Sequence, residues 1–329
     1  MYNKDMSAWS IAYSNLTSVG VLAFILGFLA SRVKGNLKLP ESSYQFISIY
    51  LLFGIGLKGG YSLKSVGLGE FLKPALTTLV SGVLVATLAF FSLGLIKKLS
   101  VIDRGSIAAH YGSTSLVTFS AALLFMESNG IFVEGYAPAL LTLIEIPGLI
   151  VGIFLASSRG VANDVHWAAI LKEVIFGKTV LILVGATLIG FLTTSSGYEK
   201  VAPLFIELLS GFLALFLLHL GYSAGANFKE VRSVGWPLGI FAIVFPITSG
   251  LLGTTIATAT GFSIGGATVF GVLCASASYI AAPAAVSIAL PKANLGLALT
   301  ASVGVTFPFN LILGIPLYYS AARFLTELF

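Results

Sequence analysis

The stretch that decides the fold is AAHYGSTSLVTFSAALLF, residues 108–125, which carries Gly112-Ser113-Thr114-Ser115 at its centre. The apolar sequence around these four residues is long enough for a membrane-spanning helix, which needs about 20 residues. A helix that breaks there leaves amides with partial positive charge at one new end and carbonyls with partial negative charge at the other. Serine and threonine cap such amides, and glycine lets a ligand approach the backbone. The sequence therefore predicts a broken helix at residues 112–115.

A second stretch of the same kind lies in the C-terminal half. CASASYIAAPAAV, residues 274–286, places Ala275-Ser276-Ala277-Ser278 about 163 positions after the first set. Two more matches have nearly the same offset, namely Gly60-Tyr61-Ser62 with Gly221-Tyr222-Ser223, and EIPGLIVG (145–152) with TFPFNLILG (306–314). Ordered matches at a constant offset indicate an internal repeat. Close helix packing would explain one serine-rich helix, but two at equivalent positions favour an ion or substrate site.

The composition is typical of a membrane protein. Of the 329 residues, 57% are hydrophobic and 9% are charged, whereas soluble domains carry about 25% charged residues. The 18 lysines and arginines are scattered between apolar runs without a basic stripe, so we expect a lipid bilayer and no nucleic acid as partner. Ten segments have the length and hydropathy of spans. They are residues 15–31, 43–57, 74–96, 104–126, 136–157, 178–194, 203–222, 236–259, 266–290 and 296–322.

Five spans in each half place the second copy upside down relative to the first, because five is an odd number. The expected fold class is an all-α polytopic membrane protein with ten transmembrane helices in 5+5 inverted-topology repeats and two broken, crossing helices. Secondary transporters of this plan bind substrate near the midplane at discontinuous helices. Residues 1–157 form the first repeat, 158–177 a short cytoplasmic linker and 178–329 the second repeat. Such crossed breaks offer amides to a small anion, and carbonyls and hydroxyls to a cation.

The orientation is predicted from the basic residues of the loops. The loops after spans 1, 3, 5, 7 and 9 hold 12 of the 18 lysines and arginines, and the opposite side holds 6. The side richer in lysine and arginine is cytoplasmic. We therefore expect a multi-pass protein of the plasma (inner) membrane with both termini outside the cytoplasm.

Three stretches resemble the sodium-dependent bicarbonate transporter (SbtA) family: YGSTSLVTF (111–119), the long run from Cys274 to Tyr319, and EGYAPALLTLIEIPGLIVGIFLA (134–156). The resemblance covers all ten spans. It implies a fold similar to bile-acid/sodium symporters and sodium/proton antiporters, with a core domain of spans 3–5 and 8–10 and a gate domain of spans 1–2 and 6–7. It also implies a homotrimer that imports bicarbonate with Na⁺. From the paired breaks we expect the transport mechanism to be an elevator-like shift of the core against the gate.

The resemblance places the substrate and sodium sites at the two breaks. The residues expected to bind substrate are Gly112, Ser113, Thr114, Ser115, Ser276, Ala277 and Ser278. The candidates for Na⁺ at the breaks are Ser115 and Ser278. Four further candidates follow from polar or ionisable side chains at membrane depth, not from the resemblance, namely Thr118, Glu145, Thr306 and Asn310. Two of them have a structural alternative, since Glu145 fits a protonated packing residue equally well and Asn310 could bridge helices instead. We expect no cofactor and no metal other than Na⁺ as coupling ion.

Family members typically carry a longer cytoplasmic insertion between the two halves and pair with a PII-like regulator. Here the gap from Ser157 to Gly177 is only about 20 residues. The short linker weighs against a PII-like partner without affecting transport.

Three other functions compete with this interpretation. GYSAG, residues 221–225, matches the G-x-S-x-G motif of hydrolases, but that motif needs a preceding strand, and here an apolar helix precedes it. An intramembrane hydrolase is therefore the least favoured interpretation. A cation/proton antiporter of this shape usually has an aspartate at the crossing, where this chain has hydroxyls. A same-fold transporter of another small anion remains open, because a pocket of serine, glycine and alanine suits any compact, oxygen-rich anion.

Overall fold

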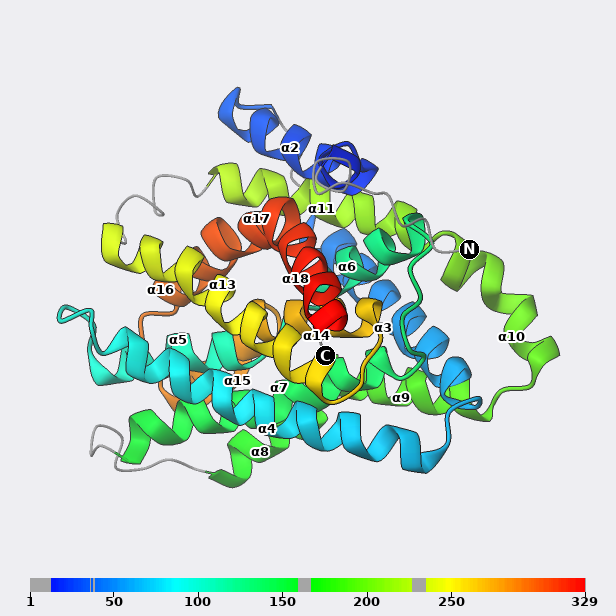
Figure 1. Cartoon of the computed structure of the whole chain (residues 1–329). Helices are drawn as coiled ribbons and strands as arrows, with labels where there is room; N and C mark the ends of the chain where they lie inside the picture. Colours follow the sequence, from blue (N-terminus) through cyan, green and yellow to red (C-terminus); the bar gives the residue numbers. More distant parts are fainter. Residues whose placement is uncertain (1–12, 36, 38, 159–166, 227–234, 329) are drawn as a thin grey trace.

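The computed structural model describes residues 13–35, 37, 39–158, 167–226 and 235–328. Within these residues the chain is helical and contains no strand (Figure 1). The first half contains α2 (Val19–Arg32), α3 (Glu41–Leu63), α4 (Leu68–Leu93), α5 (Val101–Gly112), α6 (Leu116–Ser128) and α7 (Ala137–Ala156). The second half contains α8 (Trp167–Phe176), α9 (Lys178–Leu192), α10 (Ser195–Ala202), η2 (Pro203–Glu207), α11 (Leu209–Ala226), α13 (Trp236–Ala259), α14 (Ile264–Ala275), α15 (Ala282–Ala289), α16 (Leu295–Leu299), η3 (Thr300–Thr306), α17 (Phe307–Phe309), η4 (Asn310–Gly314) and α18 (Ile315–Leu328), where η marks a π-helix.

Six helices in the described part of the chain are long and apolar enough to cross a membrane. They are α3, α4, α7, the continuous segment Ser195–Ala226, α13 and the continuous segment Leu295–Leu328. The pair α8 and α9, bent by 44°, gives a seventh candidate if it counts as one span. The helices α2 and α14 are apolar but shorter. The protein is therefore a multi-pass membrane protein, and the count of ten further requires α2 and the two broken helices to cross.

The outer surface is that of a lipid-facing protein. Large apolar side chains are exposed along several helices, including Leu76 and Val80 of α4 and Leu188 and Leu192 of α9. Polar side chains such as those of Ser113 and Ser276 are buried inside the bundle instead. Polar groups at membrane depth are costly unless they pair or serve a function, so the buried polar positions mark where the chemistry lies.

Several prolines lie inside helices that continue through them. Pro74, the first residue of the predicted span 74–96, lies inside α4, which begins at Leu68. The helices α7 and α13 continue through Pro147 and Pro246. The last segment changes to π-helix on both sides of α17, which contains Pro308. The predicted linker 158–177 contains α8, whereas its residues 159–166 lie outside the described part.

Two helix pairs approach each other closely at glycines. A Cβ atom at Gly27 of α2 would lie 2.0 Å from the Leu218 carbonyl oxygen of α11, and one at Gly190 of α9 would lie 2.2 Å from the Leu57 carbonyl oxygen of α3. Small residues let helix backbones touch in this way in membranes. Gly190 follows Gly27 by 163 positions, and Leu218 follows Leu57 by 161. The two crossings therefore join positions that the sequence repeat makes equivalent.

These crossings give a stability prediction. We expect Gly190→Ala to destabilise the protein by about 1–3 kcal/mol, because the added methyl group would overlap the backbone of α3. The matched control is Gly185→Ala in the same helix, where no atom lies within 4 Å of the new Cβ and alanine gains roughly 1 kcal/mol of helix propensity. Thermal unfolding of both variants in detergent measures the difference. Equal melting temperatures would show that α9 does not touch α3 here.

The helices α5 and α14 are built alike. Each has 12 residues and begins after a capping serine, Ser100 or Ser263, whose side chain accepts a hydrogen bond from the amide three residues on. A loop carboxylate, Glu134, additionally accepts hydrogen bonds from the Ser263 backbone N–H at 2.6 Å and the Ser263 hydroxyl at 3.0 Å. The helix α5 packs against α4 and α7, and α14 packs against α13 and α18. These contacts hold the C-terminal ends of α5 and α14 inside the bundle.

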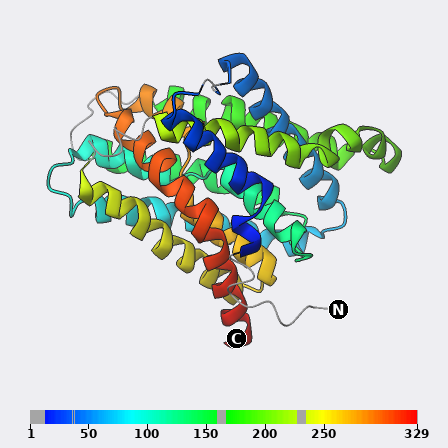
Figure 2. The same ribbon diagram turned by 90° about the horizontal axis from the view of Figure 1, so that it is seen from above.

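Figure 2 shows the C-terminal helical segment running beside the start of the described chain. The Asn15 side-chain amide donates hydrogen bonds to the Leu311 carbonyl at 2.8 Å and the Ile312 carbonyl at 2.9 Å. Both carbonyls belong to the π-helix η4, a rare form that occurs mostly as a single-turn bulge within a helix. Asn15 therefore ties the N-terminal part of the chain to the last segment.

Candidate functional site: two crossing helix breaks

The predicted break at residues 112–115 is confirmed. The helix α5 ends at Gly112, Ser113 caps it with an extended backbone, and α6 begins after Ser115. The Ser115 side chain accepts a hydrogen bond from the Thr118 amide at 3.2 Å. The amides of Leu116 and Val117, which precede Thr118 in the first turn of α6, have no intrahelical acceptor. The N-terminus of α6 therefore presents polar hydrogens inside the protein.

The second break is also present and is longer. The helix α14 ends at Ala275, Ser276 caps it with an extended backbone, and α15 begins only at Ala282. The Ser278 hydroxyl oxygen accepts a hydrogen bond from the Ala282 amide at 3.2 Å. Pro283 stands in the first turn of α15, where its missing N–H costs nothing. Six residues, 276–281, thus lie outside the helices at this break.

The two breaks bond to each other directly. The Thr114 and Ser276 hydroxyl oxygens are 2.7 Å apart, and the Ser276 oxygen also accepts a hydrogen bond from the Ser115 backbone N–H at 3.1 Å. The Ser278 backbone N–H donates to the His110 carbonyl, one of the last of α5, at 2.8 Å. All of these residues are buried. The structure therefore brings together the hydroxyl residues that the sequence placed 162 positions apart.

Helix α7 packs against the first break. A Cβ atom at Gly148 would lie 1.8 Å from the Gly112 carbonyl oxygen and 2.6 Å from the Ser113 amide nitrogen, so only glycine fits there. Glu145, less than one turn earlier, is buried and interacts with the Ser113 side chain. The carboxyl group therefore lies at the edge of the crossing, beside a residue of the first break.

Several hydroxyl groups at the crossing make no hydrogen bond of normal geometry among the described residues. They are those of Ser113, Thr118 and Tyr279. A buried hydroxyl without a partner costs about 1–3 kcal/mol. Their clustering at the breaks is therefore the pattern expected of a site that supplies the missing partners when a small polar ligand binds.

Thr306 and Asn310 brace the crossing from the last segment. The Thr306 hydroxyl donates to the Ala242 carbonyl of α13 at 2.6 Å and lies 2.6 Å from the Tyr111 hydroxyl of α5. The Asn310 side-chain amide donates to the Ala275 carbonyl at 2.8 Å, and its oxygen lies 3.0 Å from the Tyr318 hydroxyl. Asn310 thus bridges helices. Of its two predicted roles, Na⁺ ligand and helix bridge, these contacts correspond to the bridge.

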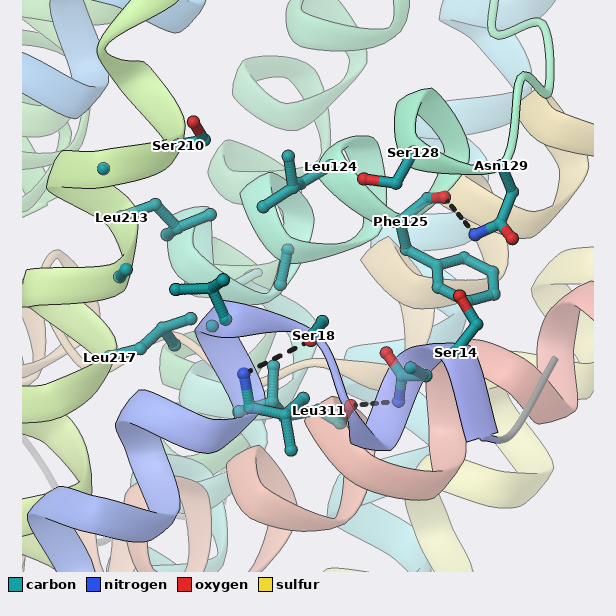
Figure 3. A pocket seen from close by; sticks show the side chains of 17 residues that line it. Ser14, Ser18, Leu124, Phe125, Ser128, Asn129, Ser210, Leu213, Leu217 and Leu311 are labelled. Carbon is teal, nitrogen blue, oxygen red and sulfur yellow. Dashed lines mark hydrogen bonds between the residues drawn. The ribbon is translucent and has the colours of Figure 1, made fainter. Parts of the chain in front are cut away.

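A pocket of about 390 Å³, here called the α6 pocket, lies between α2, α6 and α11 (Figure 3). Figure 3 shows Leu124, Phe125 and Ser128 on one side and Ser210, Leu213 and Leu217 on the other, with Ser14 and Ser18 below. None of its lining residues belongs to a break. No pattern in the sequence indicated this pocket, because its wall combines three helices that are distant along the chain.

A second pocket, of about 280 Å³, opens between α3, α11 and the segment α16–η3 and is here called the Tyr279 pocket. Its residues are Tyr44, His219, Leu220, Ser223, Ala224, Tyr279, Gly296, Leu299, Thr300, Val303 and Gly304. Tyr279 belongs to the second break. This pocket therefore reaches the crossing, whereas the α6 pocket does not.

No cluster of three or more histidine, cysteine, aspartate or glutamate side chains that could hold a metal ion occurs in residues 13–35, 37, 39–158, 167–226 and 235–328. The oxygen donors that the described residues bring to the crossing are hydroxyls, backbone carbonyls and the Glu145 carboxyl group, beside the backbone amides of α6. Such oxygen donors suit hard cations.

A multi-pass helical membrane protein with two helix breaks that meet in a buried polar site has the architecture of a secondary transporter. The family model described as the Na⁺-dependent bicarbonate transporter superfamily matches residues 20–323. The chain therefore belongs to that superfamily. A search of curated proteins finds no match. Membership confirms the predicted resemblance and makes the protein a transporter, not an enzyme. The residues that match the G-x-S-x-G motif lie within α11, so the motif lacks the preceding strand that a hydrolase needs.

Proposed function

We propose that this protein carries bicarbonate across the membrane together with Na⁺ and binds both at the crossing of the two breaks. The observation that carries the proposal is the direct bonding of Ser276 to Thr114 and Ser115. It joins the carbonyl end of α14 to the amide end of α6. A bound anion beside the α6 amides and a bound cation beside the helix carbonyls would each meet the favourable end of a helix dipole.

The substrate site is proposed to contain the residues of both breaks. They are Gly112, Ser113, Thr114, Ser115, Ser276, Ala277 and Ser278. Sodium would be held by oxygen atoms of the same region. The candidates remain Ser115, Thr118, Glu145, Ser278, Thr306 and Asn310, of which Thr118 has a hydroxyl without a partner among the described residues. Thr306 and Asn310 make bracing contacts and would act mainly by holding the breaks in register.

The 5+5 inverted repeat is proposed as the architecture behind this site. Its support is the equivalence of the α2–α11 and α3–α9 crossings and the matching lengths and caps of α5 and α14. The gate domain would then consist of α2, α3, α9 and the segment α10–α11. The core domain would consist of α4 to α7 and of α13 to α18. The two pockets lie where these two groups of helices meet.

An elevator-like movement of the core against the gate is the proposed mechanism. In the predicted orientation, the Tyr279 pocket faces the cytoplasm and the α6 pocket faces outside. Since only the Tyr279 pocket reaches a break, this conformation would release substrate inward. The ion pair between Lys58 of α3 and Glu127 of α6, 3.2 Å long, joins the two domains on the other side. Both side chains are partly exposed, so the pair would contribute less than about 1 kcal/mol and would not block movement.

Coupling to Na⁺ agrees with the energetics. Moving one anion into a cell against 100 mV, inside negative, costs about 2.3 kcal/mol. Carrying it with one Na⁺ cancels the charge and adds the free energy of the sodium gradient. A second Na⁺ would also use the membrane potential.

The homotrimer that the family resemblance implies stays a prediction. The expectation that the short linker weighs against a PII-like partner concerns a segment that includes residues 159–166, which lie outside the described part.

The test is uptake of labelled bicarbonate by proteoliposomes that contain the purified protein. We expect an inward Na⁺ gradient to drive uptake at least tenfold above the rate with an equal K⁺ gradient, since only Na⁺ is coupled. Added carbonic anhydrase distinguishes carried bicarbonate from dissolved CO₂ that crosses the lipid. An intact protein that moves no bicarbonate under either gradient would contradict the proposal, and small carboxylates would be tested next. Uptake of Na⁺ driven by an outward proton gradient without bicarbonate would favour a cation/proton antiporter instead.

A further inference from the structure

Tyr279 is a large side chain in the second break, and the first break has no equivalent residue outside its helices. The first break has Leu116 at the position 163 residues earlier, already inside α6. In the second break the chain stays non-helical from Ser276 to Ala281. Tyr279 thus stands in the part of this break that has no counterpart in the first. The difference makes the two halves of the site unequal.

The Tyr279 hydroxyl is buried at the crossing. The residue is only 9% exposed, and its hydroxyl makes no hydrogen bond of normal geometry with any described residue. The hydroxyl is close enough to the Ser115 side chain, which caps α6, for the two to interact. A phenol hydrogen near a helix N-terminus can donate to an anion bound there. Tyr279 from one break therefore adds a donor to the amide end of the other.

The ring of Tyr279 forms part of the wall of the Tyr279 pocket. It packs edge-on against Phe307 of α17, with ring centroids 5.9 Å apart. The same pocket is also walled by Tyr44 and His219, whose rings lie 4.9 Å apart. The ring therefore belongs both to the second break and to the wall of this pocket.

We propose that Tyr279 is a substrate-positioning and specificity residue, whose hydroxyl donates a hydrogen bond to an oxygen of the anion held at the N-terminus of α6. This inference rests on the proposed function, since it assumes that the anion binds at the crossing. The ligand class is a small planar oxyanion with at least one oxygen free to accept from a phenol. Neither the charge nor the helix break depends on Tyr279, so its loss weakens and broadens anion binding without abolishing Na⁺ coupling.

The experiment compares Tyr279→Phe with wild type in Na⁺-driven bicarbonate uptake by proteoliposomes. Phenylalanine keeps the ring and its packing and removes only the donor. We expect the KM for bicarbonate to rise about ten- to a hundredfold with the maximal rate changed less than twofold, since one hydrogen bond to a charged group is lost. We also expect nitrate and formate to compete with labelled bicarbonate. Their inhibition, relative to that by unlabelled bicarbonate, should be stronger in Tyr279→Phe than in the wild type. The control is Tyr136→Phe, a tyrosine that packs on Phe262 and Phe71 at the start of α7, away from the crossing.

The outcomes separate the two proposals. No bicarbonate uptake by the wild type overturns the proposed function itself. Wild-type uptake with an unchanged KM and unchanged anion selectivity in Tyr279→Phe overturns only the role of Tyr279. If Tyr279→Phe is monodisperse but does not transport, calorimetric titration with bicarbonate in Na⁺ buffer measures binding directly. A dissociation constant raised about ten- to a hundredfold supports the contact, and an unchanged dissociation constant contradicts it.

Discussion

Gly148→Ala is expected to reduce Na⁺-driven bicarbonate uptake to the background of empty liposomes. The new Cβ would lie 1.8 Å from the Gly112 carbonyl oxygen and 2.0 Å from the Gly112 carbonyl carbon. Neither atom is the end of a flexible side chain, so either α7 or the break itself must shift. A shift that removes this overlap displaces the Ser113 amide as well, because its nitrogen is 2.6 Å from the same Cβ. Misplacing site groups by about 1 Å already costs roughly 100-fold in rate in an enzyme site, and we expect a comparable sensitivity here.

The matched control for this prediction is Gly239→Ala in α13, where no atom lies within 4 Å of the added Cβ. We expect it to transport like the wild type, because both substitutions gain the same helix propensity and differ only in what the methyl group meets. Size-exclusion chromatography and thermal unfolding show whether Gly148→Ala still folds; overpacking of this kind costs about 1–3 kcal/mol. Normal uptake by a folded Gly148→Ala protein would mean that the contact between α7 and the break does not position the site.

Local sequence was sufficient to predict the first break. Gly112 is the last residue of α5, and the three hydroxyl residues after it lie outside the helices where the pattern indicates, since capping depends on neighbours within four residues. The second break was predicted at the right place but not at its full length. Residues 279–281 stay outside α15 although alanine and isoleucine are compatible with a helix, because Ser278 and Pro283 fix the start of the next helix. Tyr279 was missed for this reason.

The contacts between distant segments could not be predicted from the sequence in the same detail. The repeat indicated that the two breaks meet, but not that the Ser276 hydroxyl would cap the Ser115 amide. The sequence also left two roles open for Asn310, and only its distance to the Ala275 carbonyl shows a bridge. The two pockets lie between helices whose relative position depends on tertiary packing. Amphipathic pattern is of little help in this chain, since both lipid and protein interior are apolar.

The close approach of Gly27 and Gly190 to neighbouring backbones has a consequence for movement. Both crossings lie within the proposed gate domain, and backbone-to-backbone contact leaves little freedom for these helices to slide. The proposed core has its own tight contacts, such as that of Gly148 with Gly112. Pockets occur instead between the two groups of helices. A rigid gate, a rigid core and a looser boundary are the conditions under which one domain moves past the other as a unit.

Ser276→Ala is the second substitution from which we expect a large effect, a fall in uptake of about 10- to 100-fold. The Ser276 oxygen accepts from the Ser115 amide and lies within hydrogen-bond distance of the Thr114 hydroxyl. Alanine leaves both groups buried without that partner, at a cost of about 1–3 kcal/mol for each unsatisfied group. About 1.4 kcal/mol corresponds to a factor of ten. The expected fall in uptake follows if about 1.4 to 2.8 kcal/mol of this cost raises the free-energy barrier of the transport cycle.

The control for Ser276→Ala is Ser249→Ala, which removes a hydroxyl that is buried to a similar degree but bonds only to the Phe245 carbonyl within its own helix. We expect Ser249→Ala to keep at least half of the wild-type uptake, because that carbonyl keeps its helical partner. Ser113→Ala tests the other break, where the hydroxyl has no partner of normal geometry among the described residues; its loss should also cripple uptake if the hydroxyl binds the transported ions. Ser249→Ala and Ser113→Ala should melt near the wild-type temperature, whereas Ser276→Ala should still fold but melt lower, because it leaves two buried groups without their partner. Wild-type uptake in Ser276→Ala and Ser113→Ala alike would remove the crossing from the transport path, because no substrate could bind there without sensing the loss of these hydroxyls.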